Sequence, residues 1–213
     1  MDTLQTDTLQ AWNSILTRAT PNGRLIRRGS PQRAVAELAA DTMVKQRIIA
    51  PTRPPAGILS GDHLRTLRKY AEEAVSVKAQ AYNGHKISLP TDEGHEYLAE
   101  LPVTKWCAEV DSHIGEVGHS LYIYYDTLGE VSRLHLDNCD SCDFNLLICL
   151  SRSIPAGATG SVTYFMLGDG VTTALSLMPG DAVLFHSSST PHGRTPVVEG
   201  ERVLLASVGF DVK

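Results

Sequence analysis

The chain has 213 residues, of which 42% are hydrophobic and 20% charged, and its 19 basic and 24 acidic residues give a formal charge of −5. This is the composition of an ordinary globular protein, and the length is sufficient for one hydrophobic core without disulfide bonds. The longest apolar run, residues 146–150, is far shorter than the roughly 18 residues that span a bilayer, and residues 1–7 lack the pattern of a secretory signal, so we expect a cytoplasmic protein with no membrane partner.

The first half of the chain is predicted to be helical. Apolar residues at helical spacing indicate one helix over residues 4–16, another over 64–82, and a third within 93–116 that is interrupted near Pro102. Residues 60–62, with the sequence Ser-Gly-Asp, have the pattern of a helix cap before the second helix. The prolines in residues 50–55 exclude a helix interior there and predict an extended connection.

Basic residues are concentrated near the beginning of the chain. Residues 1–60 hold eight basic and four acidic side chains (+4), whereas residues 61–213 hold 11 and 20 (−9). The arginines that could attract a phosphate or a carboxylate are Arg24, Arg27, Arg28 and Arg33. No aromatic residues interleave them and no nucleic-acid motif accompanies them, so we predict no nucleic-acid partner.

From residue 119 onward the pattern changes to short strands separated by turn residues. The eight predicted strands are 119–125, 131–136, 144–151, 161–166, 172–178, 182–187, 191–198 and 201–210. Eight antiparallel strands in about 90 residues predict a double-sheet jelly roll of the cupin type, with a plain sandwich as the alternative. The expected fold is mainly β with N-terminal helices, in a single domain with a helical region at about 1–118 and a β core at about 119–210.

Three side chains near strand ends in this core have the residue types of a metal site. His135 and Asp137 are two positions apart and share one face of a strand, and His192 opens the seventh strand 55 residues after Asp137. Two imidazoles and one carboxylate form the facial triad of non-haem Fe(II) oxygenases, with open positions that can chelate a 2-oxo acid. The far carboxylate of that acid would need a bidentate arginine, for which Arg202 is the candidate. His186 is the alternative distal histidine, but it lies 16 residues before Arg202 rather than ten.

The order His135-x-Asp137, His192 and Arg202 resembles the motif of the Fe(II)- and 2-oxoglutarate-dependent dioxygenases. Residues 179–185 are also similar to the segment that leads to the distal histidine in that family, and the resemblance covers about residues 119–210. It implies a double-stranded β-helix that holds Fe(II) on the triad and 2-oxoglutarate on Arg202, with O2 as oxidant and ascorbate as a stimulant. The implied reaction is hydroxylation of an unactivated C–H with conversion of 2-oxoglutarate to succinate and CO2. The retained carboxylate of Asp137 disfavours halogenation, whereas desaturation and cyclisation stay open.

Further residues near the triad are candidates for contacts with ligands. Arg133 and Arg194 each lie two residues from a triad histidine, so on regular strands they share its face and could bind a carboxylate of the substrate or the cosubstrate. Tyr124 and Tyr125 lie where some members of the family place a tyrosine that binds 2-oxoglutarate, and only one of two neighbours on a strand can face the site. Ser207 is expected on the opposite face of its strand from Arg202.

The sequence carries no motif that defines the substrate or the oligomeric state. A chain of this length leaves little room for a separate recognition domain, which favours a small molecule, such as an amino acid or a biosynthetic intermediate, over a peptide or protein. A cupin-type metalloenzyme that does not use 2-oxoglutarate is a second reading, which Arg202 disfavours. A third is a metal-binding module in which Cys139 and Cys142 act as a sensing pair. These two cysteines form a single C-x-x-C and lack the second pair of ligands that a structural zinc site needs.

Overall fold

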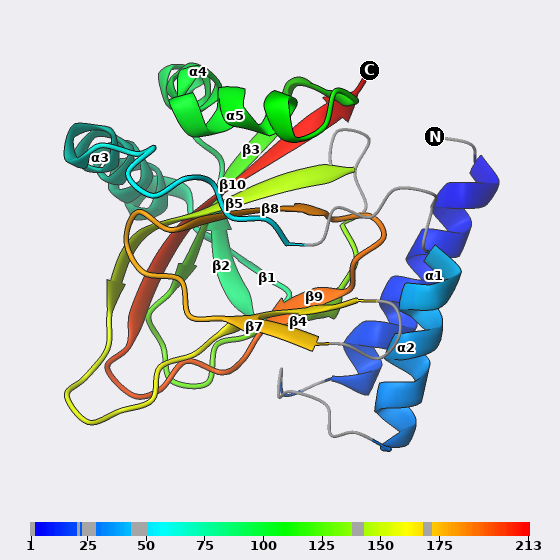
Figure 1. Ribbon diagram of the computed structural model, residues 1–213. Helices are drawn as coiled ribbons and strands as arrows, with labels where there is room; N and C mark the ends of the chain where they lie inside the picture. Colours follow the sequence, from blue (N-terminus) through cyan, green and yellow to red (C-terminus); the bar gives the residue numbers. More distant parts are fainter. Residues whose placement is uncertain (1–2, 21, 23–28, 44–50, 138–142, 168–171) are drawn as a thin grey trace.

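Two antiparallel β-sheets face each other, and helices pack on the outside of both sheets (Figure 1). The computed structural model describes residues 3–20, 22, 29–43, 51–137, 143–167 and 172–213. No helix within these residues is long and apolar enough to cross a membrane.

The sheets have six and four strands. The order in the large sheet is β1 (Gln80–Tyr82), β2 (His85–Ser88), β3 (Ile114–Tyr125), β10 (Arg202–Val212), β5 (Phe144–Ser153) and β8 (Ala182–His186). The order in the small sheet is β4 (Ser132–His135), β9 (His192–Arg194), β6 (Thr163–Met166) and β7 (Thr172–Leu175). From β3 onward the chain alternates between the two sheets, with β6 and β7 as the one consecutive pair within a sheet. This winding is that of a double-stranded β-helix.

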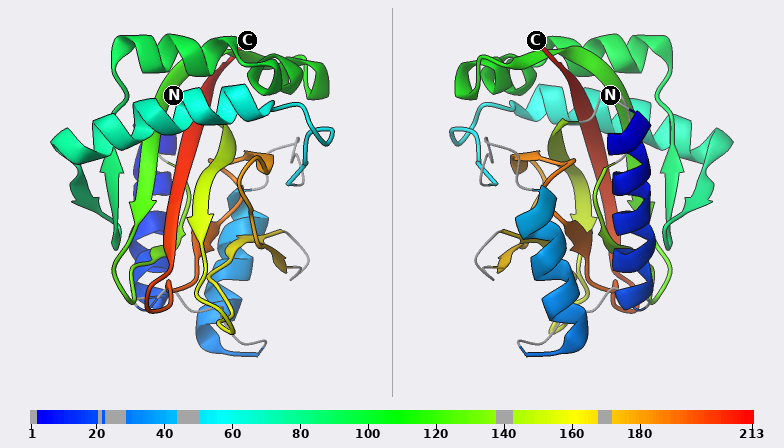
Figure 2. Two further views of the ribbon diagram at one scale, coloured as in Figure 1. Left: turned by 90° about the vertical axis from the view of Figure 1, so that its left-hand side faces the viewer. Right: turned by 90° about the vertical axis from the view of Figure 1, so that its right-hand side faces the viewer.

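The helices form two groups. Helices α3 (Gly61–Lys78), α4 (Asp92–Glu100) and α5 (Pro102–Val110) cover the outer face of the large sheet, and α1 (Thr3–Ala19) and α2 (Pro31–Met43) pack together beside the small sheet (Figures 1 and 2). Ser60 caps α3 by accepting a hydrogen bond from the backbone N–H of His63, which confirms the cap expected from the sequence.

Period-two alternation along the long strands divides the core into layers. On β10, Leu204 and Ala206 pack toward α3–α5, whereas Val203 and Leu205 pack into the space between the sheets. A third cluster, which includes Leu16 of α1, joins the first two helices to the outer face of the small sheet. The cavity described below occupies part of the space between the two sheets.

All eight predicted strands are present, and their ends differ from the expected ones by five residues at most. The predicted helices over 4–16, 64–82 and 93–116 correspond to α1, α3 and the pair α4 and α5, with the break at Pro102 as expected. The fold class is therefore confirmed as mainly antiparallel β with N-terminal helices. The division of the chain into a single domain stays a prediction.

Two parts of the first half differ from the expectation. Helix α2 was not predicted, although Ser30 accepts a hydrogen bond from the backbone N–H of Arg33 and Pro31 occupies the first helical position. The predicted helix over 64–82 was also too long, because α3 ends at Lys78 and a β-hairpin of β1 and β2 follows. The hairpin turns at Asn83 and Gly84, both with positive φ, and Asn-Gly is the preferred pair for a two-residue hairpin turn.

Candidate metal and cosubstrate site

His135, Asp137 and His192 come together at adjacent ends of β4 and β9. His135 and His192 are directly paired across these strands, and Asp137 follows β4 by two residues. Oδ1 of Asp137 lies 3.4 Å from Nε2 of His135 and 3.5 Å from Nε2 of His192. The three ligand atoms lie within 4.8 Å of one another. His186, the alternative distal histidine, lies outside this group, and its Nδ1 is hydrogen-bonded to the hydroxyl of Ser189.

The backbone sets the orientation of both imidazole rings. Nδ1 of His135 is 2.7 Å from the carbonyl oxygen of Arg133, and Nδ1 of His192 is 3.0 Å from that of Thr190. A carbonyl oxygen can only accept, so Nδ1 of each ring carries the proton and Nε2 has a free lone pair. Both lone pairs are therefore available to one cation beside Asp137, which is how metal-binding histidines are commonly held.

Asp137 is anchored through its other oxygen. The side-chain amide of Asn145 donates a hydrogen bond of 2.9 Å to Oδ2 of Asp137, and the hydroxyl of Ser207 donates one of 3.0 Å to Oδ1 of Asn145. Oδ1 of Asp137 is thus left to face the two imidazoles. Asn145 and Ser207 were not predicted in this role, and their alternation on β5 and β10 is the only signal in the sequence that would place them on the inner face.

The electrostatics of the group favour a positive charge. Burial by itself would raise the pKa of Asp137, but the imidazoles of His192 and His135 hold it well below its ordinary value. Burial by itself would lower the pKa of His135, but its contact with Asp137 raises it. Both shifts report a site that is stabilised by added positive charge. Two neutral imidazoles and a carboxylate are also the donor set that Fe(II) oxygenases use, so these residues fit that metal.

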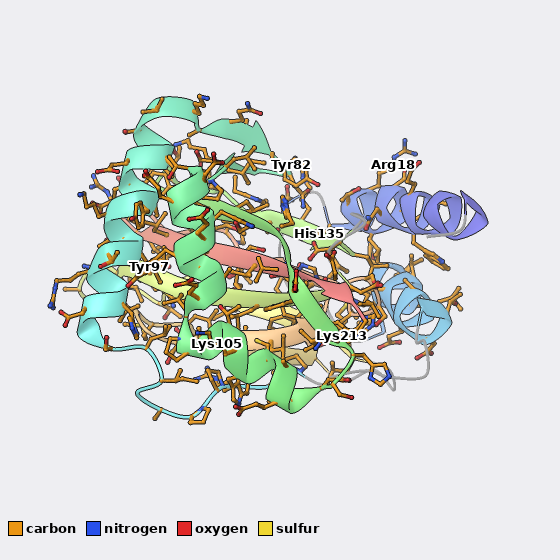
Figure 3. All side chains as sticks on the ribbon, turned by 90° about the horizontal axis from the view of Figure 1, so that it is seen from above. Arg18, Tyr82, Tyr97, Lys105, His135 and Lys213 are labelled. Carbon is orange, nitrogen blue, oxygen red and sulfur yellow. The ribbon has the colours of Figure 1, made fainter. Side chains whose placement is uncertain are left out.

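The group lies in the wall of a cavity of about 270 Å3 between the two sheets. The cavity is lined by Tyr82, His85, Ile87, Leu89, His119, Leu121, Ile123, Tyr125, Ser132, His135, Asp137, Asn145, Leu147, Thr163, Phe185, His192, Gly193, Arg194, Leu205 and Ser207. Figure 3 labels His135 of the metal-binding group and Tyr82, an exposed residue that also lines the cavity.

Arg194 is the buried cation of this cavity, with 1% of its surface exposed. Its Nε donates to the hydroxyl of Ser161 over 2.9 Å, and its Nη1 donates to the hydroxyl of Thr163 over 3.0 Å. Nη2 has no hydrogen-bond partner, and the nearest acidic oxygen, on Glu201, is 3.9 Å away. Burial lowers the pKa of Arg194, which reflects the cost of a guanidinium that is only partly paired. A carboxylate in the cavity would supply the missing acceptor.

Arg202 lies elsewhere, which corrects the expectation that it faces the triad. Its side chain is exposed on the opposite face of β10, where it lines a separate surface groove with Glu72 and Tyr124. The reason is the alternation of the strand, which turns Leu205 and Ser207 toward the cavity and Arg202 away from it. Ser207 is thus on the opposite face from Arg202, as expected.

The remaining residues predicted to contact ligands also divide between the cavity and the outer surface. Tyr125 is buried in the cavity, with the guanidinium carbon of Arg194 5.4 Å from the centre of its ring, and Tyr124 faces outward toward Lys86. Arg133 was expected on the same face as His135, but it lines a different surface pocket. Both Ser132 and His135 line the cavity although they are three residues apart, because an irregularity of β4 lies between them and reverses the alternation.

Other residues named from the sequence lie outside the described part of the chain. They are Arg24, Arg27, Arg28, Cys139 and Cys142. The acceptors of the hydrogen bonds of Arg194, which are Ser161 and Thr163, were not predicted, since hydroxyl residues at or just before the start of a short strand carry no distinctive pattern.

No protein-family model and no curated protein sequence matches the chain. Solved structures do match it. A prolyl-4-hydroxylase from Pseudomonas putida has a TM-score of 0.61 at 18% identity, over 83% of this chain and 98% of that chain. The non-heme α-ketoglutarate-dependent epimerase SnoN from nogalamycin biosynthesis has a TM-score of 0.62 at 12% identity, over 83% of this chain and 82% of that chain. A prolyl hydroxylase from Trichoplax adhaerens, in complex with a peptide of hypoxia-inducible factor, has a TM-score of 0.60 at 16% identity, over 84% and 90% of the two chains.

These neighbours establish the fold. Their identities to this chain are low, and a shared fold does not carry a shared substrate. The chain has the double-stranded β-helix of the 2-oxoglutarate- and Fe(II)-dependent oxygenases, as the resemblance in the sequence implied.

Proposed function

We propose that the protein is an Fe(II)- and 2-oxoglutarate-dependent dioxygenase that hydroxylates a small molecule. The observation that carries this proposal is the position of Arg194, which lines the same cavity as the three metal-binding side chains and whose Nη2 has no hydrogen-bond partner among the described residues. A cavity with a cation site and a separate buried guanidinium suits a bifunctional acid that chelates a metal at one end. The same argument disfavours a cupin-type enzyme that does not use 2-oxoglutarate.

Each of these residues has a defined task. His135, Asp137 and His192 would hold Fe(II), and Arg194, with the hydroxyl of Thr163 and the ring of Tyr125 beside it, would bind the distal carboxylate of 2-oxoglutarate. When bound, Fe(II) would supply the oxidative chemistry. In the overall reaction 2-oxoglutarate is converted to succinate and CO2, one oxygen atom of O2 enters succinate, and the other hydroxylates a C–H bond of the substrate. The apolar side chains of the cavity, such as Leu147, Phe185 and Leu205, would exclude water around the metal. Ascorbate would stimulate turnover by keeping the iron reduced.

Two kinds of structural neighbour bear on the substrate. SnoN belongs to the biosynthesis of a small molecule, whereas two neighbours are prolyl hydroxylases, one of them in complex with a peptide. The prolyl hydroxylases make a peptidyl hydroxylase the second candidate. We favour a small molecule because the cavity lies between the two sheets and has a largely apolar surface among the described residues. The proposed site of action is the cytoplasm.

The experiment is a measurement of succinate formed from 2-oxoglutarate in the presence of Fe(II), ascorbate and O2. Wild-type protein and a His113→Ala variant, whose substituted side chain lies outside the cavity, are expected to form succinate at equal rates, and His135→Ala is expected to lose it. Anaerobic addition of 2-oxoglutarate to the Fe(II)-loaded protein should also give a weak visible charge-transfer band in the wild type. The band should be absent in His135→Ala. Absence of both signals in the wild type would overturn the proposal.

A further inference from the structure

The part of the cavity wall that the proposed metal and cosubstrate do not use comes largely from the β1–β2 hairpin. Strand β2 extends the large sheet by pairing with β3, with Ile87 directly opposite Ile123. Alternation turns His85, Ile87 and Leu89 toward the cavity, and Tyr82 joins them from β1. We call these four residues and His119 and Leu121 of β3 the outer wall.

The hairpin is hydrogen-bonded to β4, which carries His135, and to the residue before it. The backbone N–H of Val131 donates to the carbonyl of Gly84 over 2.9 Å, and the amide of Asn83 donates to the carbonyl of Arg133 over 3.2 Å. The position of the outer wall relative to the metal-binding group is thus set by direct hydrogen bonds. A wall fixed in this way can recognise a substrate by geometry.

His85 lines the cavity, and its hydrogen bonding defines the role of each ring nitrogen. Its Nδ1 lies 3.1 Å from the carbonyl oxygen of Val131, so Nδ1 carries the proton and Nε2 is a hydrogen-bond acceptor. The ring lies between two tyrosines, with its centre 5.2 Å from that of Tyr125 and 5.9 Å from that of Tyr82. Arg194, Tyr125, His85 and Tyr82 therefore form a row that runs from the buried guanidinium to an exposed tyrosine. Burial lowers the pKa of His85 to about 4, so the ring is neutral near pH 7.

The described lining offers no charge to a substrate. Apart from histidines it has two charged residues, Arg194 and Asp137, which the proposed cosubstrate and metal occupy. Burial also lowers the pKa of His119, which keeps that ring neutral. An ammonium or carboxylate of a substrate placed beside His85, which is buried, would lose hydration without gaining a counter-charge from the described lining, which is unfavourable.

We propose that the outer wall selects an uncharged, largely apolar small molecule that donates a hydroxyl or N–H hydrogen bond to Nε2 of His85. This inference rests on the proposed function, because it assigns Arg194 and Asp137 to the cosubstrate and the metal. It replaces the expectation of a free amino acid, which would bring two charges to the wall.

The test uses the anaerobic Fe(II)- and 2-oxoglutarate-loaded protein and calorimetric titration with matched probes. Two alcohols (2-phenylethanol and cyclohexylmethanol) are each compared with the corresponding hydrocarbon that lacks the hydroxyl and with the corresponding carboxylate. At least one alcohol is expected to bind more tightly than both counterparts. In His85→Ala the advantage of that alcohol over its hydrocarbon, about 3- to 10-fold for one hydrogen bond, is expected to disappear, and in the His113→Ala control it should persist.

A second variant reverses the charge selectivity. His119→Arg places a cation in the outer wall and is expected to let the carboxylate probes bind. Binding of carboxylates alone by the wild type, binding of no alcohol, or an alcohol preference that survives in His85→Ala would each overturn the inference. These outcomes are separate from failure of the proposed function, in which the chelate band itself is missing.

Discussion

Asp137 is held through one carboxylate oxygen, and its other oxygen is directed at two imidazoles. The amide of Asn145 binds Oδ2, and Ser207 in turn fixes the amide of Asn145. Because the hydroxyl of Ser207 donates to Oδ1 of the amide, the amide must present its NH2 group to Asp137. Two side chains on neighbouring strands thus determine which oxygen of Asp137 is available to a metal.

Removal of Asn145 should therefore weaken metal binding. In Asn145→Ala we expect the affinity for Fe(II) or Mn(II) to fall by roughly 10- to 100-fold, the usual range when a residue that orients a metal ligand is lost. Anaerobic metal titration of the wild type and the variant measures this. Ser207→Ala is the matched control, with a smaller expected loss because Asn145 stays in place, and equal affinity of Asn145→Ala and wild type would remove its assigned role.

Substitutions of Arg194 and Arg202 should distinguish a residue that binds the cosubstrate from a residue that only adds charge to the surface. Arg194→Met retains the length of the side chain without its charge, and we expect the affinity for 2-oxoglutarate to fall by roughly 10- to 100-fold because charge-assisted hydrogen bonds are lost. Arg202→Ala changes an exposed residue of similar chemistry and should leave that affinity unaltered. Titration of the anaerobic Fe(II) protein with 2-oxoglutarate, followed by the visible chelate band, measures both. If Arg202→Ala weakened the binding of 2-oxoglutarate and Arg194→Met left it unchanged, the role would return to Arg202.

At the scale of elements, the β1–β2 hairpin depends on a turn that only glycine fits. Gly84 has a φ of 94°, and a Cβ at this position would lie 2.8 Å from Cγ2 and 3.0 Å from the carbonyl oxygen of Val131. Gly129 also has a positive φ, 84°, but nothing lies within 4 Å of the position of its Cβ. These two glycines therefore separate the effect of backbone conformation from that of close packing.

The paired substitutions should differ in stability. Gly129→Ala is expected to lower the free energy of unfolding by about 1–2 kcal/mol, the effect of a positive φ on a residue with a Cβ. Gly84→Ala should lower it by roughly 1–3 kcal/mol more, because Val131 and the hairpin must move apart. Urea unfolding of both variants gives the comparison. Equal losses would mean that the hairpin is not packed against Val131 as described.

At the scale of the whole molecule, a buried ion pair at one end of β5 and β10 of the large sheet is linked through Ser161 to Arg194 of the small sheet. Arg152 of β5 contacts Glu201, just before β10, over 3.0 Å, and neither side chain is exposed. Glu201 also accepts hydrogen bonds from the backbone N–H and the hydroxyl of Ser161, the residue whose hydroxyl receives Nε of Arg194. The packing of the sheets and the position of the proposed cosubstrate arginine thus share one network.

This network should make stability depend on acid pH. Burial by itself would raise the pKa of Glu201, but hydrogen bonds from Ser161, Val198 and Arg152 lower it below its ordinary value of 4.5. A lowered pKa in the folded state means that the ionised Glu201 stabilises the fold above about pH 4.5 and that this stabilisation is lost as the pH falls.

Glu201→Gln tests this directly. Near pH 7 we expect it to lower the free energy of unfolding by about 3–5 kcal/mol, as for loss of one partner of a buried pair. The difference from wild type should shrink as the pH falls below about 4.5, because the stabilisation by the ionised Glu201 of the wild type is then lost. Chemical unfolding at several pH values measures it, and a difference that does not change with pH would contradict the role of ionised Glu201.

The sequence by itself determined the fold class and the three metal-binding candidates. Strand alternation and turn residues are local properties, so the eight core strands could be located, and His135, Asp137 and His192 could be recognised by their order. The hairpin and α2 are also encoded locally, in Asn83-Gly84 and Ser30-Pro31, but a signal of two residues is too short to predict an element by itself.

Only the tertiary structure decided which arginine faces the cavity and which residues surround it. A shift of one residue along a strand moves an arginine from its inner to its outer face. An irregularity such as that in β4 causes this shift without a signal in the sequence. Arg194, Asn145 and His85 come from three different strands, so their convergence follows from how the sheets pair and face each other. The local pattern specifies the chemistry available, and the packing of distant strands determines where that chemistry is placed.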